Sequence, residues 1–261
     1  MSHPAEVINQ TNLKIVNGKY DEAITSLTNI LRKLKQYTSG DATIDLPIGL
    51  YNGEDSDRSG ECDSSSSSSA SFEYNFFSLP NVSSFLKTSD FIYSGDVSTP
   101  FAAQEKFQLI IFRDPIKALF CKPLDTKVCE QLAYVILYNL ALSHHLKSFE
   151  PGTLSSETRE LRRAYLRKAL SLYEHSRLIQ MEAAITIGVE VVHSMALVSS
   201  LGHLYHELGY PQKAKICIQY LLSTMMYIIH CGELDILGNS VDGFFDMILP
   251  LITKATAAPA A

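Results

Sequence analysis

Residues 201–214, Leu-Gly-His-Leu-Tyr-His-Glu-Leu-Gly-Tyr-Pro-Gln-Lys-Ala, decide the fold because they join the end of one helix to the start of another. Gly209 suits the left-handed backbone of a tight turn, and Pro211 is tolerated in the first turn of the following helix. The residues expected where the two helices meet are small at the closest approach and larger elsewhere: Gly202, Ala214, Leu201, Tyr205 and Ile218. The stretch therefore predicts a closely packed pair of antiparallel helices.

This stretch resembles the tetratricopeptide repeat, whose pattern places Leu-Gly, Tyr, a turn and Ala at set intervals. Val198 and Ile218 stand where the family has aromatic residues, so the copy is divergent. A second copy sits on longer helices, with its packing residues at Leu140, Ala141, Ala169 and Tyr173. A third copy matches only in its turn and second helix, at Gly18, Ala23 and Leu27.

Composition and hydrophobic periodicity divide the chain into five regions. These are a helical hairpin over 1–37, an acidic and serine-rich loop over 38–71, an extended aromatic-rich insert over 72–125, a repeat-like helical domain with a C-terminal cap over 126–254, and a tail over 255–261. The loop holds the run Ser64–Ser69 and buries too little apolar area to fold. It is read as a solvated linker, with phosphorylation of the serines as the functional alternative.

The insert carries an unusual density of aromatic side chains. Ten of the 25 Phe and Tyr residues of the chain fall between Phe72 and Phe112, where helical periodicity is absent. So many aromatic rings are not expected to stay in water. We therefore expect the insert to lie along the helices in an extended form.

Three helical pairs predict an all-α fold in which antiparallel hairpins stack as a short solenoid like those of tetratricopeptide-repeat proteins. An unrelated bundle of helical hairpins is the alternative. The resemblance implies that the first helix of each pair lines a concave groove for a peptide or a partner domain. Carried onto this chain, the groove residues are Val135, Tyr138, Asn139, Leu142, His145, Ala196, Ser199, His203, His206 and Glu207. A clamp for a terminal carboxylate is not expected, because Val135, Ala196 and Ser200 are not basic.

Charge and hydropathy exclude several classes of partner. The net charge is -6 and the pI about 5.7, whereas nucleic-acid binding requires a basic surface. The longest uncharged run in the hydrophobic C-terminal half, residues 216–232, is shorter than the span of about 20 apolar residues that a membrane helix needs. The first residues show no signal-peptide pattern, and the five cysteines include no Cys-x-x-Cys pair. We expect a cytoplasmic or nuclear protein with reduced thiols.

No motif for catalysis, cofactor binding or metal binding is found in the sequence. Phosphate-binding loops and nucleophile elbows are missing, and the spacing of His203, His206 and Glu207 is not that of a zinc protease. The expected function is a non-enzymatic scaffold that binds a protein or peptide in its concave groove. The alternative is a self-contained regulatory or structural domain whose groove is filled by residues 72–112. The sequence leaves the identity of the partner and the oligomeric state open.

Overall fold

The described part of the chain is all-helical. In this computed structural model, the structure describes residues 3–38, 112–118, 126–150, 156–182 and 189–232. Within those ranges there are six helices and no strand: α1 (Pro4–Val16), α2 (Tyr20–Thr38), α5 (Thr126–Lys147), α6 (Ser156–Glu182), α7 (Val189–Glu207) and α8 (Pro211–Cys231). The acidic serine loop, most of the aromatic insert, the C-terminal cap and the tail lie outside these ranges.

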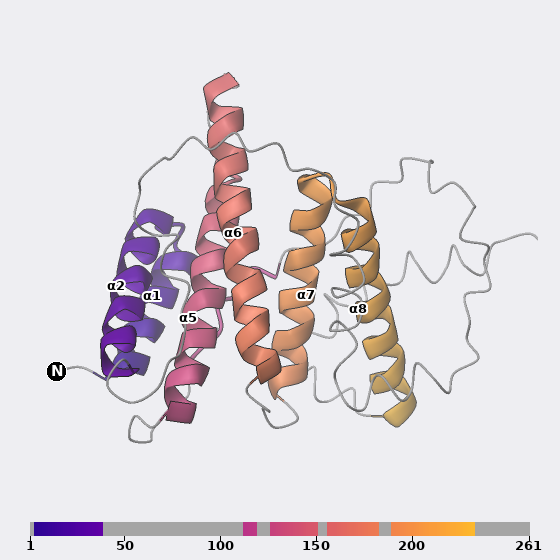
Figure 1. Cartoon of the computed structure of the whole chain (residues 1–261), viewed down its shortest axis with the longest axis horizontal. Helices are drawn as coiled ribbons and strands as arrows, with labels where there is room; N and C mark the ends of the chain where they lie inside the picture. Colours follow the sequence, from indigo (N-terminus) through magenta and orange to yellow (C-terminus); the bar gives the residue numbers. More distant parts are fainter. Residues whose placement is uncertain (1–2, 39–111, 119–125, 151–155, 183–188, 233–261) are drawn as a thin grey trace, which may run out of the picture.

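The helices pair along the chain and lie side by side in a row (Figure 1). Within each pair α1 packs on α2, α5 on α6, and α7 on α8. Between the pairs, α2 packs on α5 and α6 packs on α7, with a smaller contact between α1 and α5. Each helix therefore buries its apolar face against neighbours in sequence order.

Glycines form the tight turns inside two of the pairs. Gly18 follows α1 with a φ of 74°, and Gly209 follows α7 with a φ of 82°. The N–H of Tyr210 donates to the carbonyl of Tyr205 at 2.7 Å, which closes the end of α7. A left-handed residue just after a helix is the usual way to satisfy its last carbonyls. The turn at 209 therefore has the conformation expected from the sequence.

Replacing Gly209 with alanine is expected to lower the free energy of unfolding by about 1 kcal/mol, because a Cβ disfavours the left-handed conformation. Among the described residues, none other than its two chain neighbours has an atom within 4 Å of the Cβ position, so the cost comes from the backbone and not from a clash. Urea unfolding of Gly209→Ala measures it. Gly209→Asn is the matched control, because asparagine tolerates this conformation and should lose less stability. Equal losses in the two variants would contradict this explanation.

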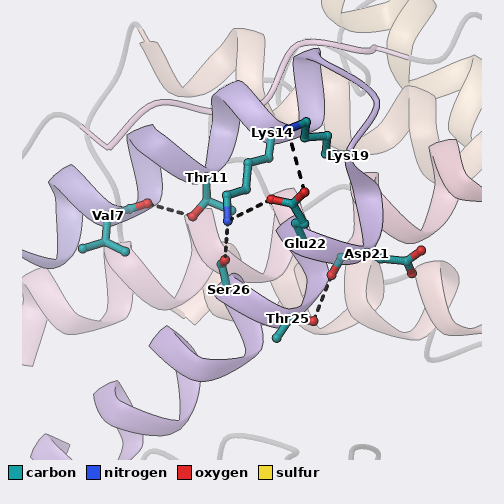
Figure 2. Close-up of polar contacts among 8 residues, drawn as sticks. All are labelled: Val7, Thr11, Lys14, Lys19, Asp21, Glu22, Thr25 and Ser26. Atoms are coloured by element: carbon teal, nitrogen blue, oxygen red, sulfur yellow. Dashed lines mark hydrogen bonds and ion pairs between the residues drawn. The ribbon is translucent and has the colours of Figure 1, made fainter.

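Polar contacts fix α1 on α2 (Figure 2). Lys14 Nζ donates to Ser26 Oγ at 3.1 Å and lies 3.6 Å from Glu22 Oε2, so a single α1 side chain reaches two residues of α2. Glu22 also lies 3.8 Å from Lys19 Nζ in the connecting turn. Partly exposed ion pairs contribute about 0–1 kcal/mol each, so apolar packing stabilises the pair and these contacts orient it.

Helix α5 is the most enclosed element of the described chain. Every side chain from Leu132 to Leu146 is buried. Helices α2 and α6 cover two of its sides, and α1 touches it as well. The seven residues 112–118, which are not helical, also bond to it through Asn139. Because α5 has neighbours on several sides, its sequence is apolar around most of its circumference.

Candidate peptide-binding site

Three asparagines from two helices hold the irregular segment 112–118 by its backbone. Asn9 and Asn12 lie three residues apart on α1, and Asn139 lies in the middle of α5. Their side-chain amides face Ile116 and Ala118 of the segment. We call these three residues the asparagine clamp.

The first backbone contact is at Ala118. The Nδ2 group of Asn9 donates to the Ala118 carbonyl at 2.9 Å, and the Ala118 N–H donates to Asn9 Oδ1 at 2.9 Å. A side-chain amide offers one acceptor and two donors, so it pairs with both backbone groups of one residue at once. Asn9 thus occupies the position that a neighbouring strand would take beside Ala118.

The second backbone contact is at Ile116 and uses two asparagines. The Ile116 N–H donates to Asn139 Oδ1 at 2.8 Å, and Asn139 Nδ2 donates to the Ile116 carbonyl at 2.8 Å. Asn12 Nδ2 donates to the same carbonyl at 2.8 Å. Asn139 Nδ2 also donates to Asn12 Oδ1 at 2.9 Å, which joins the two side chains in one buried network. Buried polar groups are costly unless they are bonded in this way.

The pairing pattern is that of an extended chain. In an extended backbone, the N–H and C=O of residues i and i+2 point to the same side. Ile116 and Ala118 are two apart, and both bond to the clamp. Their side chains are buried, whereas Lys117 between them is exposed. The site therefore binds the backbone of an extended segment and encloses two of its side chains.

Most of the groove residues inferred from the sequence are buried in the structure. Seven of the ten are buried: Val135, Tyr138, Asn139, Leu142, His145, Ala196 and Ser199. His203 is half-buried, and only His206 and Glu207 are exposed. The physical reason on α5 is that α2, α6 and the segment 112–118 enclose it. Of that set, Asn139 contacts the segment through its side chain.

Most of the residues expected to pack the helical pairs are buried. The buried ones are Leu140, Ala141, Ala169, Tyr173, Leu201, Gly202, Tyr205, Ala214, Ala23 and Leu27. Ile218 is half-buried against the core, and Gly18 and Gly209 form exposed turns. The Tyr205 hydroxyl donates to Glu174 Oε1 on α6 at 2.8 Å, so α7 is bonded to the preceding pair as well as packed on it.

A second cluster lies between the end of α5 and α7. His145 Nε2 lies 3.2 Å from His203 Nδ1, so one of the two rings donates to the other. Phe149 contacts both rings, at 5.7 Å from each centroid. Arg162 lies over Phe149 and pairs with Glu207 at 2.7 Å. The cluster joins α5, α6 and α7 near the protein surface.

Burial keeps the histidines of α5 neutral. Burial lowers the pKa of His145 to about 3, and the nearby His203 acts in the same direction. Desolvation also lowers the pKa of His144 to about 3, with the charges of Lys168 and Lys147 acting in the same direction. No group of three or more metal-ligating side chains occurs among the described residues. Both side chains are buried, where the neutral form of the imidazole is favoured.

Sequence reasoning did not select Asn9 or Asn12, although both leave a signal. Asparagine is a poor helix former, and two of them recur three residues apart inside α1. Asn139 is a polar residue within the apolar run of α5. The sequence does not show which residues more than a hundred positions apart will contact each other, as Asn9 and Ala118 do.

Comparisons with known proteins give no relative. No family model, no curated protein and no solved structure matches this chain. Among the helices that the structure describes, none is both long and apolar enough to cross a membrane. The class of the protein therefore rests on its helical architecture and on the asparagine clamp.

Proposed function

We propose that this chain is a non-enzymatic protein-interaction scaffold of tetratricopeptide type, and that it binds an extended segment of a protein at the α1–α5 face. The observation that carries the proposal is the asparagine clamp, whose amides bond both backbone groups of Ile116 and of Ala118. A site that bonds backbone groups recognises the shape of an extended chain, as protein-recognition sites that add a strand do.

The arrangement of helices supports the proposal. The clamp residues come from α1 and α5, which are the first helices of two consecutive pairs and touch each other. Proteins built from stacked helical pairs present such helices along one continuous surface. The turn glycines and buried small residues at 202 and 214 add the local pattern of the repeat.

The same observation favours a second candidate function. In the described conformation the clamp is occupied by residues 112–118 of the chain itself. A self-contained helical domain that stores its own extended segment there would have a structural or regulatory role and bind no partner at this face. The two functions differ in whether a second protein depends on the clamp.

Capture from a cell extract with the whole chain separates the two functions. We expect at least one protein to be recovered at least about tenfold better by Ile116→Pro, whose own segment lacks an N–H that the clamp requires, than by the same chain with Asn9→Ala/Asn12→Ala, because the three lost hydrogen bonds together weaken binding by at least about 1.4 kcal/mol. Cross-links to the captured protein should fall on α1 and α5. Asn29→Ala is the matched control, because Asn29 is an exposed asparagine of α2 bonded only locally to Arg32. Recovery that is equal for all three chains would reject the scaffold function.

A further inference from the structure

The chain carries its own competitor for the proposed binding site. We infer that residues 112–118 are an internal ligand of the asparagine clamp, an inference that rests on the proposed function. We further infer that the clamp takes, from another protein, an extended peptide in the same register. That peptide has an apolar residue at the position of Ile116, any residue at 117 and a small residue at 118. Three features of the bound segment define this partner.

The first feature is the need for two free backbone N–H groups. The clamp accepts from the N–H of Ile116 and from that of Ala118. Proline has no N–H, so a matching peptide cannot have proline at either position. Pro115 directly before Ile116 is compatible, because the clamp accepts no N–H at that position and the fixed φ of proline suits an extended chain. The partner is thus an extended peptide that tolerates proline only outside the two bonded positions.

The second feature is the environment of the side chains. Ile116 is 5% exposed and Ala118 is 4% exposed, whereas Lys117 points to solvent. Burial of a β-branched side chain at the first position contributes apolar contact area. A side chain larger than alanine at position 118 would overpack the site. The clamp therefore selects an apolar side chain at the position of Ile116, any side chain at 117 and a small side chain at 118. The hydrogen bonds themselves select only for an extended backbone.

The third feature is the covalent connection of the internal ligand. Only residues 119–125 separate Ala118 from Thr126, where α5 begins. A short tether holds a segment at an effective concentration of about 1 mM near its site. With a dissociation constant of about 10 µM for the segment itself, an external peptide would then bind the intact chain about 100-fold more weakly than it binds the free clamp. Release of the segment therefore controls access to the clamp.

The test uses the full chain and a capped synthetic peptide with the sequence of residues 112–118. In Ile116→Pro the chain's own segment loses an N–H that the clamp requires, so the clamp is freed while its asparagines stay intact. We expect the labelled peptide to bind Ile116→Pro about 100-fold more tightly than the wild type. N-methylation of the peptide at Ile116 should weaken binding at least about tenfold. N-methylation at Lys117, which donates no hydrogen bond to the clamp, is the matched control and should change binding little.

Two results would overturn the inference. One is a folded Ile116→Pro chain, with the helix content of the wild type, that binds no peptide. The other is equal binding of the two N-methylated peptides, since the clamp would then not recognise the backbone groups. If Ile116→Pro does not fold, excess peptide is added to the wild type and amide exchange is measured. Faster exchange at Ile116 and Ala118 supports displacement, and unchanged exchange rejects it. A failure here leaves the capture experiment unaffected, because that experiment needs no particular peptide sequence.

Discussion

Replacing Asn139 with alanine is expected to make docking of the segment 112–118 less favourable by about 3 kcal/mol. The Ile116 N–H and Asn12 Oδ1 would both lose the Asn139 partner described above, and a buried polar group without a partner costs about 1–3 kcal/mol. The segment can avoid that cost by detaching and exposing its backbone to water. The amides of Ile116 and Ala118 should therefore exchange their hydrogens about 100-fold faster than in the wild type. Hydrogen exchange resolved by residue measures this directly.

The global stability of the same variant provides the comparison. Detachment of one segment leaves the helical pairs in place, so amides in the middle of α6 and α8 should keep their protection. Asn29→Ala removes an exposed asparagine and should leave exchange at Ile116 unchanged. If Asn139→Ala did not accelerate hydrogen exchange at Ile116, the clamp would not be what holds the segment.

Lowering the pH from 7 to 5 is expected to reduce the free energy of unfolding by about 4 kcal/mol through His144 and His145. Burial holds the pKa of each at about 3 in the folded chain, whereas an unfolded histidine titrates near about 6.5. Between these values the unfolded chain binds more protons, so stability is full above about pH 6.5 and falls as the pH drops towards 3. Each histidine then lowers the free energy of unfolding by about 1.4 kcal/mol for each pH unit below 6.5. Urea unfolding at several pH values gives the slope.

Two variants separate this mechanism from general acid sensitivity. His145→Gln removes one titrating group and should reduce the slope below pH 6.5 by about 1.4 kcal/mol per pH unit. Leu140→Ala deletes a fully buried side chain of the same helix and should lower stability by about 3 kcal/mol at every pH, with the slope unchanged. A slope that His145→Gln leaves intact would place the acid sensitivity elsewhere.

The helices were readable from the sequence because they rest on local patterns. Gly209 and Pro211 placed the end of α7 and the start of α8 close to their observed positions. The groove residues came instead from the repeat resemblance. On α5 the resemblance assigned Tyr138 and His145 to the groove, and both residues have an exposed fraction of 0% in the structure. Periodicity identifies an apolar face but does not tell how many neighbours will cover a helix.

The sequence by itself determined the helical class, the turns at Gly18 and Gly209, and the small residues at the helix contacts, because each follows from interactions within a few residues along the chain. Only the tertiary structure decided the candidate site. It brings Asn9 and Asn12 from the start of the chain, Asn139 from α5 and the backbone of Ile116 into one hydrogen-bonded network. Such a network depends on contacts between residues that are distant in sequence. It also uses backbone groups, and because every residue carries these, the sequence of the segment does not show which of them will be bonded.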